Sequence, residues 1–233
     1  MQAVLFDVDD TLYDLSAPFF EAYRIFFVPK YDVSAEQIYP VSRKYSNAAY
    51  PLALAGKITM REVYLSRIRD AFAEFGVRVS EKEALDFQEL YAARQHEISL
   101  SETMHEILRY CAPRAALGII TNGMSAQQWG KIQSLQAERY IPRDHIFVSR
   151  DVGIEKPEPG IFRCAAQRMG LTAADSICYD GDSYECDVAG ARAAGWKSVW
   201  MNRHHRRKPQ GMPEPDYRAE SEQELFLVLK SIL

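Results

Sequence analysis

The stretch MQAVLFDVDDTLYD, residues 1–14, contains an apolar run that ends abruptly in acidic residues. Residues 3–6 are all apolar, and Asp7, Asp9 and Asp10 follow within four positions. A short, continuous apolar run is typical of a strand that is buried on both faces of a parallel sheet. We therefore expect a buried strand whose carboxyl end carries several like charges.

Four later runs have the same character, and each follows a segment with a helix-like pattern. They cover residues 115–121, 145–149, 176–180 and 197–201. Strands that alternate with helices predict an α/β fold, here a doubly wound parallel sheet. Because the carboxyl ends of parallel strands line a ligand crevice, the residues at those ends are the candidate site residues.

A long stretch between the first and second of these runs reads as helices throughout. Ser or Thr followed three residues later by Glu or Gln marks helix starts at Ser34–Gln37, Thr59–Glu62 and Ser80–Glu83. A fourth such box, Ser221–Glu224, predicts a C-terminal helix. We therefore expect an α/β catalytic core from residues 1–16 and 99–233, with residues 17–98 inserted as a helical cap on a two-strand hinge.

Composition restricts the class of partner. The 233 residues are 47% hydrophobic and 26% charged, and the formal net charge is -4, which favours a globular protein. The chain lacks the excess of basic residues that would predict nucleic-acid binding, and none of its apolar stretches is long enough to predict a membrane span. The four cysteines form no C-x-x-C pair, so reduced thiols in a cytoplasmic protein are expected. The chain is expected to be a monomer or a small homo-oligomer.

The predicted strand ends carry a chemically coherent set of polar residues. Asp7 and Asp9 alternate with an apolar residue, so both can point the same way, and Asp182 follows a later strand. Like charges raise one another's pKa, so these carboxylates need a cation to stay ionised. Oxygen-only ligands favour a hard ion such as Mg²⁺. With Lys156 nearby, the set suits phosphoryl transfer, in which Asp7 attacks phosphorus and Asp9 protonates the departing oxygen.

Four stretches, in this order, resemble the haloacid dehalogenase-like hydrolase superfamily over essentially the whole chain. They are FDVDDT at 6–11, IITNG at 119–123, EKPEPGIF at 155–162 and GDSYECDVAGARAAG at 181–195. Each alone is a weak match, but all four at or just after strand ends make a specific one. The resemblance implies a Rossmann-like core with strand order 3-2-1-4-5 and a helical cap inserted after the first motif.

The resemblance also implies catalytic roles. Asp7 would be the nucleophile that forms an aspartyl-phosphate, and Asp9 would act first as an acid and then as a base. Thr121 and Lys156 would hold the phosphate, with further polar contacts from Asn122.

The metal site implied by the resemblance is built from acidic residues. Mg²⁺ would bind Asp7, the backbone carbonyl of Asp9 and Asp182, with Asp187 as a supporting carboxylate. Asp180 departs from the pattern, because relatives often have an apolar residue there, and its role is open.

Asp9 favours phosphate-ester hydrolysis, because the dehalogenases of the superfamily lack an aspartate at this position and halide departure needs no proton. ITNG, VSRDVGIEKPEPGIF and WMNR most resemble the nucleotidase-like branch of the helical-cap phosphatases. The leading hypothesis is a Mg²⁺-dependent phosphatase acting on a small phosphorylated metabolite, such as a nucleoside monophosphate or a sugar phosphate. A phosphomutase, a 2-haloacid dehalogenase and a phospho-accepting signalling module remain alternatives.

Simpler interpretations exist for several of these residues. The acidic stretch after the first strand could be a turn that caps the next segment, and Lys156 taken alone could be an ordinary loop lysine. The basic run at residues 203–208 could bind nucleic acid or steer phosphate, but a solvated loop after the fifth strand is the simpler interpretation.

Overall fold

The computed structural model describes residues 2–233 of the chain. The chain divides into two compact units. One unit combines Met1–Asp14 with Ile98–Leu233, and the other is the continuous segment Leu15–Glu97. The shorter segment is therefore an insertion, and both of its ends continue into the α/β unit.

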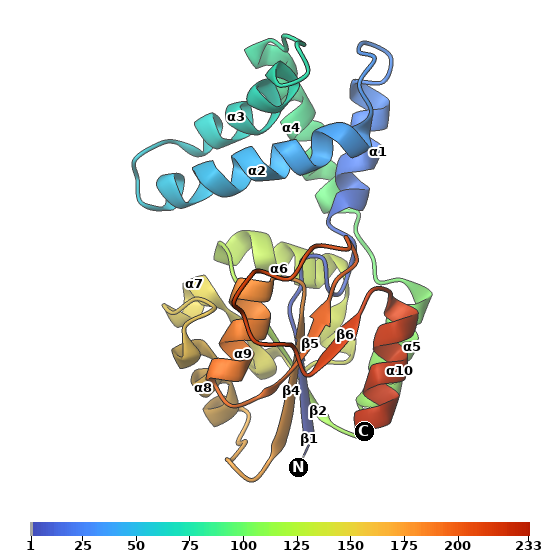
Figure 1. Ribbon diagram of the computed structural model, residues 1–233, viewed down its shortest axis with the longest axis vertical. Helices are drawn as coiled ribbons and strands as arrows, with labels where there is room; N and C mark the ends of the chain where they lie inside the picture. The colour runs from blue at the N-terminus through green and yellow to red at the C-terminus, as the bar shows by residue number, and fades with distance from the viewer. Residues whose placement is uncertain (1) are drawn as a thin grey trace. The chain divides into compact units, whose positions relative to one another are not determined.

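A six-stranded parallel sheet forms the centre of the α/β unit (Figure 1). Its spatial order is β3-β2-β1-β4-β5-β6, which confirms the predicted order 3-2-1-4-5 and adds a sixth strand beside β5. The strands are β1 (Gln2–Phe6), β2 (Ala116–Thr121), β3 (Ile146–Val148), β4 (Ser176–Gly181), β5 (Lys197–Met201) and β6 (Tyr217–Ala219). The sequence did not predict β6, because its three residues, YRA, carry no apolar run.

Helices cover both faces of this sheet, with α8 and α9 on one side and α5 and α10 on the other (Figure 1). Phe162 of α8 and Ala191 of α9 pack against Leu5 and Tyr179 of the sheet in one buried apolar cluster. The helices of this unit are α5 (Glu102–Cys111), α6 (Ser125–Ser134), α7 (Ser149–Val152), α8 (Pro159–Arg168), α9 (Ala189–Ala193) and α10 (Glu222–Ile232). Burial on both faces explains why the central strands read as continuous apolar runs.

The capping box predicted at the start of α10 is only half present. The Ser221 side chain accepts a hydrogen bond from the Glu224 backbone N–H at 3.2 Å, as predicted. The Glu224 carboxylate, however, accepts from the N–H of Glu220 at 2.8 Å, one residue before the N-cap. The Ser221 backbone is extended, with φ -147°, and the Glu220 N–H, in place of the Ser221 N–H, donates to the Glu224 carboxylate.

The inserted unit consists of four helices around an aromatic core. All three predicted capping boxes are present in full, at Ser34, Thr59 and Ser80. Phe27 packs against Phe72 and Phe87 with ring centroids 4.7 and 4.9 Å apart. The helices are α1 (Ser16–Phe26), α2 (Ala35–Leu54), α3 (Met60–Ala73) and α4 (Glu81–Gln95). Their aromatic residues at helical spacing thus form the core of this unit.

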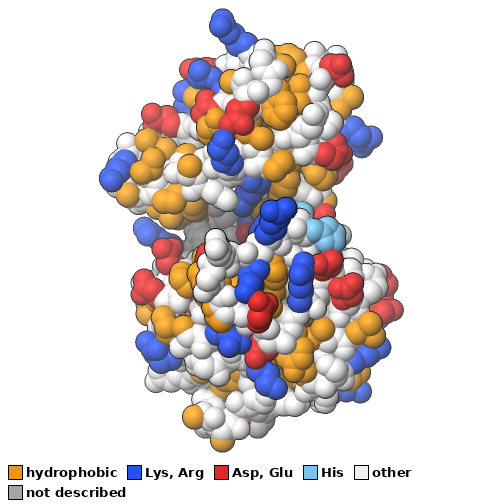
Figure 2. All heavy atoms as spheres, viewed as in Figure 1, with side chains coloured by type: hydrophobic (Ala, Val, Ile, Leu, Met, Phe, Trp, Pro, Cys, Tyr) orange, Lys and Arg blue, Asp and Glu red, His pale blue; other side chains and the backbone are white. Residues whose placement is uncertain are grey.

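Charges of both signs are interspersed over the face shown in Figure 2. No large region of that face carries a single sign, in keeping with the small net charge of -4. Within residues 2–233, every helix is too short or too polar to cross a bilayer. The expected lack of a nucleic-acid partner stays a prediction.

Register places the candidate site at the carboxyl end of the sheet. Phe6, the last residue of β1, lies between Ile119 of β2 and Asp180 of β4. The backbone N–H of Asp7 continues this pairing and donates to the Asp180 carbonyl at 2.8 Å. The side chains that follow these three strands therefore lie along one edge, as expected for a parallel sheet.

Candidate active site

The end of β1 places Asp7 in a buried cluster of charges. The Lys156 ammonium lies 2.7 Å from Asp7 Oδ1 and 2.7 Å from Asp187 Oδ1, and it donates to the Tyr179 hydroxyl at 2.8 Å. The side chains of Lys156, Asp187 and Asp7 are 2%, 1% and 9% exposed. Burial alone would lower the pKa of Lys156, but Asp187 and Asp7 raise it well above its usual value. Lys156 therefore stays protonated and can neutralise further negative charge at this point.

Residues of β2 and β4, the strands on either side of β1, fix the position of Lys156. Asn122, directly after β2, donates to the Lys156 carbonyl at 2.8 Å and accepts from the Lys156 N–H at 2.9 Å. Tyr179 in β4 donates its hydroxyl to the Ile120 carbonyl at 2.6 Å and accepts from the Lys156 ammonium. Asn122 thus orients the lysine loop, a task that the sequence did not predict. Its contact with phosphate stays a prediction.

A second and separate set of side chains holds Asp9. The Lys131 ammonium lies 2.8 Å from Asp9 Oδ1 and 2.7 Å from Oδ2, and the Tyr13 hydroxyl donates to Oδ1 at 2.6 Å. Gln128 donates to Oδ2 at 3.2 Å, and its carbonyl accepts from the Thr121 hydroxyl at 3.3 Å. Sequence reasoning missed Lys131 and Gln128, which both lie on α6. Their spacing of three residues puts them on one helix face, which was the only available signal.

The end of β4 holds two more of the predicted carboxylates. The Trp200 indole donates to the Asp182 carbonyl at 2.9 Å, and the Ser183 N–H donates to Asp187 Oδ2 at 2.9 Å. A Cβ at Gly181 would lie 2.4 Å from the Asp187 carboxyl group. Glycine at this position therefore allows Asp187 to pack against the strand end beside Lys156.

The pKa values of the acidic groups are shifted in opposite directions, although burial acts on all of them to raise the pKa. Burial raises the pKa of Asp7 to about 7 against the opposing effect of Lys156, and it also raises the pKa of Asp182 and Asp180 well above the usual value. Burial acts on Asp9 too, but Lys131 and the hydrogen bonds outweigh it and lower the pKa of Asp9. Two aspartates two residues apart thus favour different protonation states, which is typical of an acid–base site.

Asp7, Asp182 and Asp187 fit a divalent cation. One carboxylate oxygen from each lies within 4.8 Å of the others, and all three donors are hard oxygen ligands. Burial, together with the neighbouring carboxylates, raises the pKa of Asp7 and Asp182, so a bound cation would favour the ionised form of both. The predicted contribution of Asp9 is its backbone carbonyl, and it stays a prediction.

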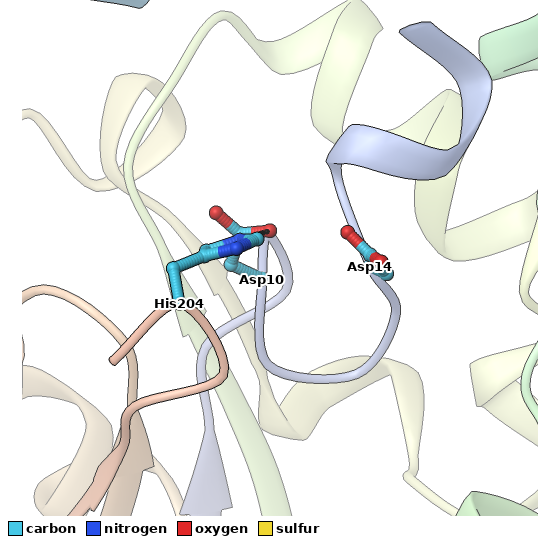
Figure 3. Close-up of side chains that lie close together, drawn as sticks. All are labelled: Asp10, Asp14 and His204. Atoms are coloured by element: carbon cyan, nitrogen blue, oxygen red, sulfur yellow. Dashed lines mark ion pairs between the residues drawn. The ribbon is translucent and has the colours of Figure 1, made fainter. Parts of the chain in front are cut away.

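A second group lies beside this one, formed by Asp10, Asp14 and His204 (Figure 3). Their possible ligand atoms also lie within 4.8 Å of one another. His204 Nε2 is 3.1 Å from Asp10 Oδ1, so these two side chains already pair. Asp10 comes from the loop after β1 and His204 from the loop after β5, which brings the basic run at 203–208 to the site.

Comparison with known families settles the class of this arrangement. The family model of the haloacid dehalogenase-like hydrolases matches residues 1–195. The chain belongs to this family. The hydrolase is therefore an enzyme, and its strand order follows the fold that its sequence motifs implied.

Curated relatives of the hydrolase include nucleotidases and phosphatases. The chain is 35% identical to the pyrimidine 5'-nucleotidase YjjG of Escherichia coli, over 49% of this chain and 50% of that protein. It is 26% identical to the putative HAD-hydrolase YfnB of Bacillus subtilis, over 98% of this chain and 95% of that protein. The human N-acylneuraminate-9-phosphatase is 30% identical, over 60% of this chain and 56% of that protein. The hydrolase thus spans about half the length of two of these three relatives.

Solved structures confirm the fold over the whole chain. The magnesium-bound structure of Bacillus subtilis YfnB has a TM-score of 0.72 and 23% identity, and the alignment covers 98% of each chain. The L-2-haloacid dehalogenase of Xanthobacter autotrophicus has a TM-score of 0.73 and 16% identity, with 100% of each chain covered. At such identities the likeness shows the fold alone, because phosphatases and dehalogenases share it.

Proposed function

We propose that the hydrolase is a Mg²⁺-dependent phosphatase that cleaves a small phosphomonoester through an aspartyl-phosphate. The arrangement of Asp7 and Asp9 supports this proposal most directly. Asp7 lies beside a protonated lysine that can neutralise phosphoryl oxygens, whereas Asp9 belongs to a separate hydrogen-bonded set. A nucleophile and an acid–base group with different surroundings are what a two-step hydrolysis needs.

In the first step, Asp9, which is ionised in the free enzyme, takes up a proton as the anionic substrate binds beside it. An Asp7 oxygen then attacks phosphorus, and the bond from phosphorus to the leaving oxygen breaks as Asp9 gives that oxygen the proton. In the second step, Asp9 takes a proton from water as the water oxygen attacks phosphorus, which releases phosphate and restores Asp7. Lys156 and the Thr121 hydroxyl bind phosphoryl oxygens throughout. Mg²⁺ held by Asp7, Asp182, the Asp9 carbonyl and the supporting Asp187 would supply further charge neutralisation.

Asp9 also separates this proposal from dehalogenation. Departure of a halide needs no proton, whereas departure of an alkoxide does. Asp9 accepts hydrogen bonds from Tyr13 and Gln128 in addition to its ion pair with Lys131, so the structure holds this carboxylate in a defined position. An acid–base group positioned in this way favours a phosphate ester as the substrate.

Relatives that act on small phosphorylated compounds support the proposed substrate class. They include a pyrimidine 5'-nucleotidase, a glyceraldehyde 3-phosphate phosphatase and an N-acylneuraminate-9-phosphatase. We propose a nucleoside monophosphate or a sugar phosphate for this chain, turned over in the cytoplasm. Residues 17–98 are proposed to act as a cap that selects the leaving group, since the inserted unit folds around its own core.

A panel of phosphorylated metabolites tests this function. Free phosphate should accumulate over many cycles for each enzyme molecule, with p-nitrophenyl phosphate as a general substrate. One phosphate per protein would instead indicate a phospho-accepting module. Halide release from 2-haloacids, without phosphate release from any ester, would overturn the proposal. Isomerised phosphosugars in place of free phosphate would indicate a phosphomutase.

Binding of Mg²⁺ to the free hydrolase is expected to release protons near neutral pH. Burial raises the pKa of Asp7 to about 7 and also raises that of Asp182, so these groups are partly protonated before a cation binds. Because the cation binds the ionised carboxylates, its apparent affinity should increase as pH rises from about 6 to about 8. Calorimetry in two buffers of different ionisation enthalpy measures the released protons. An affinity that does not change with pH would contradict this assignment.

A further inference from the structure

The loop that follows β5 is fastened to the first motif by several side chains. Arg203 donates to the backbone carbonyls of Asp10 at 3.2 Å and Thr11 at 3.0 Å, and it pairs with Glu222 at 2.8 Å. His204 reaches Asp10 Oδ1 at 3.1 Å (Figure 3). The basic run is therefore not a freely solvated loop, which corrects the simpler interpretation of residues 203–208. Its contacts hold it against the loop that carries the catalytic aspartates.

Arg206 extends this contact to a predicted metal ligand. Its guanidinium donates from Nη1 to Asp182 Oδ2 at 2.7 Å and from Nη2 to Asp10 Oδ2 at 3.3 Å. Asn202 holds the Arg206 backbone, since it donates to the Arg206 carbonyl at 3.0 Å and accepts from the Arg206 N–H at 2.8 Å. Two side-chain contacts and two backbone contacts thus hold the permanently charged Arg206 guanidinium against the Asp182 carboxylate.

The position of Asp182 itself does not depend on Arg206. Trp200 donates to the Asp182 carbonyl at 2.9 Å, and the Ser183 N–H bonds to Asp187, so other groups hold the backbone there. Asp10 would also keep a neighbour without Arg206, because His204 Nε2 lies 3.1 Å from its other carboxylate oxygen. Loss of the guanidinium would therefore remove a charge from Asp182 and leave the end of β4 in place.

We infer that Arg206 is a built-in counter-cation that competes with Mg²⁺ for the Asp182 carboxylate and so weakens metal binding. The inference rests on the proposed function, because it takes Asp182 as a ligand of the metal. It gives the basic loop after β5 a role in setting how much Mg²⁺ the enzyme needs.

The sign of the effect follows from electrostatics. A guanidinium bound to Asp182 repels a divalent ion at the same carboxylate and neutralises part of the charge that attracts it. The Arg206 side chain is 49% exposed, so water and salt screen this repulsion and keep it moderate. We expect Arg206→Gln to tighten Mg²⁺ binding by about three- to tenfold at low ionic strength, and by less in high salt.

The chain offers a closely matched control for this substitution. Arg207 is adjacent and exposed, and no ion pair or side-chain hydrogen bond is present for it within residues 2–233. Arg207→Gln removes the same charge without touching Asp182 and should leave Mg²⁺ affinity close to that of the wild type. Arg206→Lys keeps the positive charge, so its Mg²⁺ affinity should also be close to that of the wild type.

Calorimetric titration of the full chain with MgCl₂, in the absence of substrate, measures the Mg²⁺ dissociation constant of the wild type and of the three variants. Tighter binding by Arg206→Gln alone, with a difference that shrinks in high salt, supports the inference. Equal Mg²⁺ dissociation constants for Arg206→Gln and Arg207→Gln would overturn the inference while leaving the proposed function intact. Weaker binding by Arg206→Gln would also overturn it, since Arg206 would then orient Asp182 for the metal. Lack of Mg²⁺ binding by every variant and the wild type would overturn both the inference and the metal of the proposed function.

Discussion

Replacing Asp7 with asparagine is expected to abolish turnover while leaving the fold intact. An amide is a poor nucleophile of nearly the same shape as a carboxylate, so no aspartyl-phosphate can form, and we expect a loss of at least about a thousandfold in kcat. The fold should tolerate the change, because burial disfavours the charged form of Asp7 and raises its pKa to about 7. Lys156 keeps Asp187 as a counterion at 2.7 Å.

Steady-state release of phosphate from p-nitrophenyl phosphate measures this loss, and circular dichroism with a thermal melt confirms that the variant is folded. Asp144→Asn is a matched control, because Asp144 is exposed and lies in η2 (Arg143–His145), away from the strand ends that carry the site. It should retain full activity. A folded Asp7→Asn variant with activity like the wild type would show that another group attacks phosphorus, and the proposed mechanism would be wrong.

The strands that position the site could be predicted from sequence because their pattern is local. Residues 3–6 and the four later runs are apolar throughout, and a strand buried on both faces needs no other signal. Strand β6 has no such pattern, because it pairs with β5 through three residues at the edge of the sheet. Its formation depends on a neighbouring strand that is already in place, which a local pattern does not record.

The same distinction applies to the candidate site. Asp7 was predicted because it directly follows a strand, where topology brings strand ends together. Lys156 was predicted because it stands in the motif EKPEPGIF, which comes after β3 along the chain. Lys131 lies 122 positions from Asp9, on a polar helix where a lysine is unremarkable in the sequence. Arg206 belongs to a basic run that reads as solvated loop. The contacts of Lys131 and Arg206 depend on how α6 and the loop after β5 pack against the first motif, which the local sequence does not record.

Replacing Asp9 with asparagine should slow hydrolysis in a way that depends on the leaving group. An alkyl phosphate needs a proton on its departing oxygen, so the variant should lose about 10²–10⁴-fold on such a substrate. p-Nitrophenolate leaves without that help, so the loss in the first step should be smaller. The second step still needs a base to activate water, and the variant lacks one.

The second step is where the structure adds to this prediction. Lys131 contacts both oxygens of Asp9, and together with the hydrogen bonds it lowers the pKa of that carboxyl group. The free enzyme therefore holds Asp9 in the ionised form that a base requires. Because Asp9→Asn retains Asp7, we expect a burst of p-nitrophenol followed by slow turnover, as phosphorylated Asp7 accumulates.

Rapid-mixing kinetics with p-nitrophenyl phosphate, and steady-state rates with an alkyl phosphate, measure these two effects separately. The Asp144→Asn variant should show neither a burst nor a loss on either substrate. Equal losses on the aryl and alkyl esters, without a burst, would mean that Asp9 supports the site in some other way than by moving protons. A burst with p-nitrophenyl phosphate and a large loss on the alkyl ester would instead place both proton transfers on Asp9, because one missing carboxylate would have impaired the departure of the alkoxide and the attack of water.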